Sequence, residues 1–97
     1  MSGWSIDSRN YCCNEYSRFQ GSVAKNKVFD RDGVLIGSFS GNQIYDRNGQ
    51  LVAQWDPPLI RWSNGQVEEM DSNYITDDMR LIAAYLLLEL WNIARFV

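Results

Sequence analysis

A twelve-residue pattern that occurs twice limits the possible folds of this chain more than any other feature. The segment 28–39 recurs as the segment 44–55, at an offset of 16 residues and without a gap. Each copy contains an apolar pair, a polar turn sequence and an apolar arm, which is typical of consecutive β-hairpins. Repeats at a short fixed period indicate a sheet in which neighbouring hairpins bury one another.

The polar centre of each copy has the chemistry of a tight hairpin turn. The first Asp can accept a backbone N–H, and the glycine can adopt the positive φ of a turn with a glycine bulge. A third, altered copy follows at the same offset, whereas no earlier copy has a turn glycine. The predicted turn residues are Asp30, Asp32, Gly33, Asp46, Asn48, Gly49, Asn64 and Gly65.

The apolar arms alternate with period two, which predicts one buried face for each. The small residue at Gly37 and at Ala53 implies that another element approaches the sheet closely at that position. The side chains predicted to share the buried face are Leu35, Gly37, Phe39, Leu51, Ala53 and Trp55.

The C-terminal segment predicts a long helix from Thr76, as a cap followed by two acids, to residue 97. Its apolar residues fill an arc of roughly 200°, whereas a surface helix needs a stripe of about 100°. One small sheet covers only part of such an arc, so we expect a homo-oligomer, a tetramer or a dimer. The predicted interface residues are Leu86, Leu87, Leu90, Trp91, Ile93, Ala94 and Val97.

These elements predict one α+β domain of 97 residues. A small repetitive antiparallel β-hairpin sheet of about three 16-residue repeats (27–70) precedes the long C-terminal helix (76–97). Residues 1–26 are expected to be an extended or loosely helical lead-in, since Cys12, Tyr16 and Phe19 have helical spacing between Ser8 and Gly21. An irregular strand pair from Tyr11 to Phe19 is the alternative.

Composition argues against several classes of partner. The net charge is −3 and no Lys/Arg run is present, so nucleic acid is an unfavourable partner. Without histidine, the adjacent Cys12 and Cys13 make no zinc site, and they are interpreted as reduced thiols of a cytoplasmic protein. The apolar run Leu81–Leu88 is too short for a membrane span of about 20 residues.

No pattern indicates catalysis or a cofactor. The Asp-Gly turns lack the spacing of a calcium loop, and no histidine is present to activate a cysteine nucleophile. Glu68, Glu69 and Asp71 are interpreted as a solvated loop. We therefore expect neither an enzyme nor a bound metal. Aromatic rings within the repeat could stack on a ligand, although core packing is the preferred interpretation; the candidates for binding are Tyr45, Trp55 and Trp62.

The unit Tyr45-Asp46-Arg47-Asn48-Gly49, preceded by Phe29-Asp30-Arg31-Asp32-Gly33, resembles the short repeats of the bacterial four-fold β-flower proteins. The resemblance covers residues 26–67 and implies petals of short hairpins around an axis, without a known activity. The expected function is a self-associating protein-interaction module of bacterial or phage type, including an inhibitor or immunity-type protein that binds a target protein. The alternative is a small-ligand binding protein with its pocket at the oligomer interface.

Overall fold

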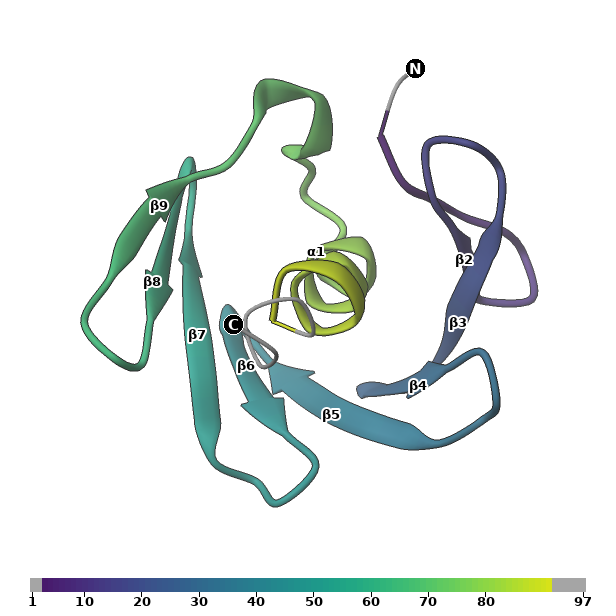
Figure 1. The fold of residues 1–97 in the computed structure, drawn as a ribbon, viewed down its shortest axis with the longest axis horizontal. Coiled ribbons are helices and arrows are strands. Elements are labelled where there is room, and N and C mark those ends of the chain that lie inside the picture. Colours follow the sequence, from purple (N-terminus) through teal and green to yellow (C-terminus); the bar gives the residue numbers. More distant parts are fainter. Residues whose placement is uncertain (1–2, 92–97) are drawn as a thin grey trace.

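The computed structural model describes residues 3–91, and within this range nine antiparallel strands are followed by a short helix. Each strand pairs with its neighbours in sequence, so the sheet is a meander that curls around the helix (Figure 1). The predicted α+β class, with an antiparallel sheet and a C-terminal helix, is confirmed. The strands are β1 (Ser5–Ile6), β2 (Tyr11–Cys13), β3 (Phe19–Ala24), β4 (Lys27–Asp30), β5 (Leu35–Ser40), β6 (Gln43–Asp46), β7 (Leu51–Asp56), β8 (Leu59–Trp62) and β9 (Val67–Glu69).

The predicted turn residues lie at the connections β4–β5, β6–β7 and β8–β9. Asp30 Oδ1 accepts the backbone N–H groups of Asp32 and Val34 at 2.8 and 2.9 Å, and Gly33 has φ +79°. The turn at Asp46 repeats these hydrogen bonds, and Gly49 and Gly65 have φ +82° and +94°. Local polar chemistry therefore sets these three turns, as the sequence predicts.

A further turn of this type joins β2 and β3, in the segment that we expected to be a lead-in. Asn14 Oδ1 accepts the N–H groups of Tyr16 and Arg18 at 2.9 and 3.0 Å, and Ser17 has φ +62° in the place of the glycine. The preferred expectation of a loosely helical segment is wrong here, because Tyr16 lies in a turn between two strands. The alternative of an irregular strand pair is confirmed, since β2 and β3 pair with a register shift. Asn14 stands 16 residues before Asp30, so the offset itself was the available signal.

Alanine at either of two turn glycines is expected to lower the free energy of unfolding by about 1 kcal/mol. A Cβ at Gly33 or Gly49 would meet nothing within 4 Å, so the loss comes from the positive φ alone. Urea denaturation of Gly33→Ala and Gly49→Ala measures it. Gly33→Asn is the matched control, and its loss should be smaller because Asn tolerates this conformation. Unchanged midpoints for both alanine variants would contradict the assigned turn geometry.

The concave face of the sheet carries the core. Cys12, Val28, Ile44 and Ile60 occupy the same place in successive hairpins, 16 residues apart, and each is at most 1% exposed. They pack in one cluster with the helix. The core is therefore a row of equivalent positions that curves with the sheet.

A bulge in three hairpins corrects the predicted buried face. Phe29 pairs with Leu35 while its neighbour Val28 pairs with Gly37, so Ile36 is the extra residue. The same shift in β6–β7 turns Leu51 outward, at 42% exposed, and buries Val52. Simple alternation fails because a bulge changes the face to which the following side chains point. Gly37, Ala53 and Trp55 do lie on the buried face.

The helix is α1 (Met79–Tyr85), continued by the π-helical segment η2 (Leu86–Leu90) and preceded by the 3₁₀ turn η1 (Ser72–Tyr74). Its N-cap is Asp78, whose Oδ1 accepts the N–H of Arg80 at 3.0 Å, rather than Thr76. The Arg80 Nη1 donates to Asn10 Oδ1 at 2.7 Å, which ties the helix start to the β1–β2 turn. The expected helix to residue 97 extends beyond the described residues.

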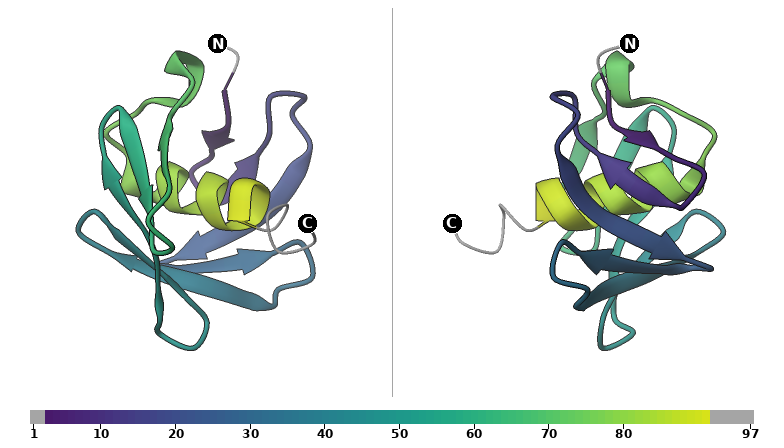
Figure 2. Two further views of the ribbon diagram at one scale, coloured as in Figure 1. Left: turned by 60° about the vertical axis from the view of Figure 1, so that its left-hand side comes forward. Right: turned by 90° about the vertical axis from the view of Figure 1, so that its right-hand side faces the viewer.

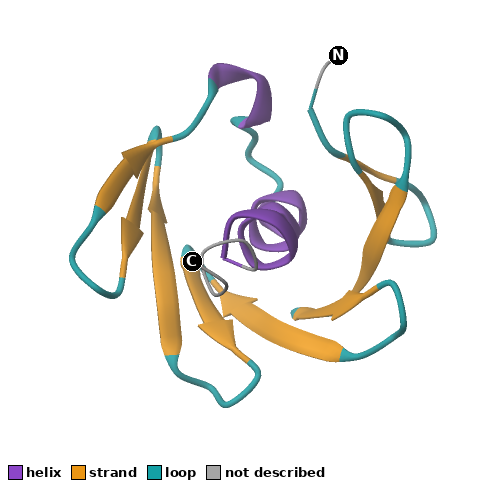
Figure 3. Ribbon diagram, viewed as in Figure 1, coloured by secondary structure: helices purple, strands orange, loops and turns teal. Residues whose placement is uncertain are grey.

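The curled sheet encloses the helix on several sides (Figures 2 and 3). Ile82, Ala83, Ala84, Leu86 and Leu87 are all at most 1% exposed within the single chain. We expected the sheet to cover about half of the apolar arc of the helix, because a flat sheet can contact only one side of a helix. A strongly coiled nine-stranded meander covers much more, so the arc no longer demands a second subunit.

The predicted close approach of another element at Gly37 is confirmed. A Cβ on Gly37 would clash with the carbonyl oxygen of Tyr45 and lie 2.9 Å from Leu87 Cδ1. Gly21, one repeat earlier, is similarly close to the carbonyl oxygen of Phe29 and to Leu88 Cδ1. The glycines thus allow the leucines of the helix to contact β3 and β5.

Candidate functional site

The structure separates the three aromatic residues that the sequence offered for binding. Trp55 faces the core and is 3% exposed. Tyr45 lies half-buried on β6, where its hydroxyl donates to Gln43 Oε1 at 2.6 Å. Trp62 is half-buried at the end of β8, and its buried Nε1–H has no acceptor among the described residues. No common binding surface is formed by the three rings.

The residues predicted for a subunit interface fall into three groups. Leu86 and Leu87 are 0% exposed under the sheet of their own chain, which assigns them to the core and not to an interface. Leu90 and Trp91 are half-buried. Ile93, Ala94 and Val97 lie outside the described residues.

An aromatic pocket of about 340 Å³ lies between the first strand, the η1 region and the helix. Its three rings are in contact: Tyr74 stacks on Tyr85 at 4.5 Å between centroids, and Trp4 meets Tyr85 edge-on at 5.5 Å. Gly3 permits this arrangement, because a Cβ there would lie 2.5 Å from the Asn73 carbonyl oxygen. The remaining lining residues are Ser5, Ile6, Asn73, Ile75, Thr76 and Leu81.

The electrostatic surroundings of the aromatic pocket are acidic. The Tyr74 hydroxyl in η1 donates to Oε2 of Glu15 in the β2–β3 turn at 3.3 Å. Burial, with a contribution from Glu15, raises the pKa of Tyr74. Burial also raises the pKa of Tyr85 to about 12, helped by the nearby Tyr74 and by Glu89. Both phenols therefore stay protonated at neutral pH.

No sequence pattern indicated this pocket, because its three rings are far apart along the chain. Trp4 precedes the first strand, Tyr74 is in η1 and Tyr85 ends α1. Small-ligand sites are typically lined by apolar side chains with a few polar groups, and this pocket has such a lining. Only the curling of the sheet, which brings the chain's first described residues to the helix, joins them.

A second feature that sequence reasoning missed is an aromatic patch, defined here as Tyr11, Tyr16 and Phe19 on the β2–β3 hairpin. Tyr16 is 76% exposed, and Tyr11 and Phe19 are each 41% exposed. The rings of Tyr11 and Phe19 meet edge-on at 5.3 Å, and the guanidinium of Arg9 lies 4.7 Å above Tyr11. Large exposed rings that contact one another are typical of a protein-binding surface.

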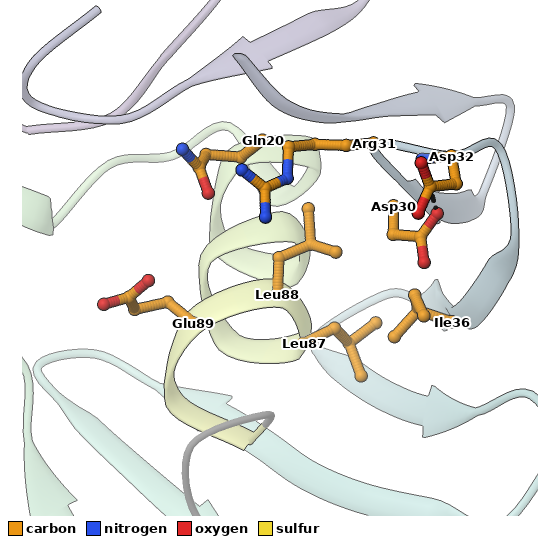
Figure 4. Close-up of a pocket in the computed structure, with 8 residues that line it drawn as sticks. All are labelled: Gln20, Asp30, Arg31, Asp32, Ile36, Leu87, Leu88 and Glu89. Carbon is orange, nitrogen blue, oxygen red and sulfur yellow. Dashed lines mark hydrogen bonds between the residues drawn. The ribbon is translucent and has the colours of Figure 1, made fainter. Parts of the chain in front are cut away.

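Another pocket, of about 330 Å³, lies between the helix and the β4–β5 turn (Figure 4). Leu87 and Leu88 line its helical side, and Ile36 and the turn side chains line the other. Asp30 is already committed to its turn through two backbone hydrogen bonds. The lining of this second pocket combines Arg31 with the carboxylates of Asp30, Asp32 and Glu89, so it favours neither a cationic nor an anionic ligand. The aromatic pocket is therefore the better candidate for ligand binding.

The two cysteines are free thiols in different environments. Burial raises the pKa of Cys12 to about 12, while Cys13 lies half-buried on the strand beside it. The thiolate, which is the nucleophilic form, is therefore scarcer at Cys12 than at an exposed cysteine.

Iodoacetamide at pH 8 is expected to modify Cys13 in the native protein and to leave Cys12 unmodified. Tandem mass spectrometry of the peptide that contains both residues distinguishes the two positions. In urea, both cysteines should react, which is the control for reagent and accessibility. Equal rates of modification at both residues in native buffer would show that β2 opens readily.

Two further kinds of site, a metal centre and a membrane-spanning helix, are absent from the described part of the chain. Among residues 3–91, no group of three or more Cys, Asp or Glu side chains could hold a metal ion. In the same range, no helix has the length and apolar character needed to cross a membrane. No known protein family, characterised protein or solved structure matches this chain.

Proposed function

We propose that this chain is a non-enzymatic protein-interaction module that docks through the aromatic patch. The supporting observation is the exposure of three contacting or neighbouring rings on one hairpin, Tyr11, Tyr16 and Phe19. Full burial of such side chains is worth about 1.5–3 kcal/mol each, so a partner that covers them gains affinity. Aromatic rings are also enriched among the residues that dominate binding energy.

The module is proposed to consist of repeated hairpins around the helix. Turns that begin at residues 14, 30, 46 and 62 share the same backbone hydrogen bond between their first and fifth residues, at 2.8–2.9 Å. Four hairpins spaced in this way support the resemblance to the β-flower proteins, whose name describes such petals. An inhibitor or immunity-type protein is the form of module that we favour.

We also propose self-association, through a surface on the outside of the sheet and not through the apolar face of the helix. Leu86 and Leu87 are enclosed, whereas the rings of the aromatic patch are exposed to solvent. The two free thiols support a reducing, cytoplasmic compartment. The alternative function, small-ligand binding, is supported by the aromatic pocket, which lies within one chain rather than between subunits.

The experiment compares wild-type protein with Tyr16→Ser/Phe19→Ser in quantitative affinity capture and in sedimentation velocity. Val34→Ser/Leu51→Ser is the matched control, since it removes two exposed apolar side chains from other hairpins. We expect a stoichiometric partner, or self-association, that the patch variant loses and the control variant keeps. Equal recovery of every protein and equal sedimentation for all three would contradict the proposal.

A further inference from the structure

The geometry points to the aromatic pocket as a binding site for a small alkylammonium group. Three rings line it, Trp4, Tyr74 and Tyr85, and the hydroxyl of Tyr74 donates a hydrogen bond to the carboxylate of Glu15, which places a negative charge beside this lining residue. An ammonium group is attracted both by ring faces and by carboxylates, whereas an anion would be repelled by both. This inference concerns a different surface from the aromatic patch.

The charges around the pocket favour a cation consistently. The charged side chains with the largest effect on the two phenols are Glu15, Asp71 and Glu89, and all three are acidic. No Lys or Arg is among the lining residues. Arg80, the basic residue of α1, is directed elsewhere, to Asp78 and Asn10.

The size of the pocket and its polar groups narrow the ligand further. A volume of about 340 Å³ is at the small end of ligand sites, and it suits a group such as trimethylammonium on a short chain. Tyr85 lines the pocket, and its hydroxyl can exchange a hydrogen bond with a hydroxyl or carbonyl on the ligand. The group can belong to a free metabolite or to a modified lysine of a peptide.

The test is an NMR titration that follows the indole N–H signals of the tryptophans. Choline is the cationic probe, and 3,3-dimethylbutan-1-ol, which has the same shape without the charge, is its neutral counterpart. We expect choline to shift the Trp4 signal saturably and to bind about tenfold more tightly than the neutral alcohol. Equal binding of the two probes, or no saturable shift at Trp4, would overturn the inference.

Two variants make the assignment specific. Glu15→Gln alters an exposed residue and keeps the acceptor for Tyr74, so the fold should persist while choline affinity falls about threefold. Tyr74→Leu removes a ring and should weaken choline about tenfold. Glu68→Gln, on the opposite edge strand, is the control and should change nothing. If Glu15→Gln and Glu68→Gln behave alike, the acidic part of the argument is wrong.

A tripeptide, glycyl-trimethyllysyl-glycine, separates the two sources of the ligand. Tighter binding than choline assigns the site to a lysine side chain of a protein, and weaker binding assigns it to a free metabolite. The same tripeptide with leucine in the centre is the control. Saturable binding of the leucine tripeptide as tight as that of choline would also overturn the inference.

Discussion

Leu86→Asp is expected to abolish cooperative folding rather than to dissociate subunits. Leu86, the first residue of η2, is 0% exposed and packs in the core cluster under the concave face of the sheet. Removing a buried leucine side chain costs about 2–5 kcal/mol, and burying an unpaired carboxylate in its place costs several more. Since a small domain has only about 5–15 kcal/mol of stability, the variant should be largely unfolded.

Leu51→Asp is the matched control, because it makes the same change at a leucine that is 42% exposed. Its loss should stay within about 1 kcal/mol. Circular dichroism with urea or heat measures both variants, and sedimentation reports their association state. A Leu86→Asp protein that melts like the wild type, yet sediments as a smaller species, would return this residue to a subunit interface.

The sequence predicted the parts of the fold that are governed by short-range chemistry. At Asp30 and Asp46, a carboxylate and a glycine three residues later are enough to determine the turn. The turn at Asn14 was not predicted, because its residue with positive φ is Ser17, whereas the other turns have glycine at this position. Serine rarely signals this conformation, so only the 16-residue offset indicated the turn.

The coiling of the sheet could not be predicted from the sequence, because no local residue pattern encodes it. The bulges at Ile36 and Val52 bend the strands and increase their twist, but each adds only one residue to a pattern that reads as simple alternation. We assigned the apolar arc of the helix to a subunit interface because we assumed a flat sheet, whereas a curled sheet encloses the described part of the helix.

The candidate binding surfaces were missed for a related reason. Trp4, Tyr74 and Tyr85 meet only because the meander brings η1 and α1 next to the first described residues. The aromatic patch lies in the segment that was hardest to interpret, where Tyr16 and Phe19 have helical spacing by coincidence. Burial of Trp55 could be anticipated from its repeat position, which the sequence analysis preferred over binding.

Gly37→Ala is expected to cost about 3 kcal/mol of unfolding free energy, well above the loss at Gly33. The new Cβ would clash with the Tyr45 carbonyl oxygen on β6 and lie 2.9 Å from Leu87 Cδ1. A strand backbone cannot move away without breaking its pairing, and Leu87 is fully buried, so neither neighbour can yield cheaply. At Gly33, by contrast, the same substitution meets open space.

A double-mutant cycle with Leu87→Ala tests whether helix and strand are in contact at this point. Leu87→Ala alone should cost about 2–5 kcal/mol, because it leaves a cavity under the sheet. In the Gly37→Ala background it should cost less, since the shorter side chain removes one of the two clashes. Urea denaturation of the four proteins gives the coupling. Strict additivity, or a Gly37→Ala loss no larger than that of Gly33→Ala, would show that β5 and the helix do not approach as closely as described.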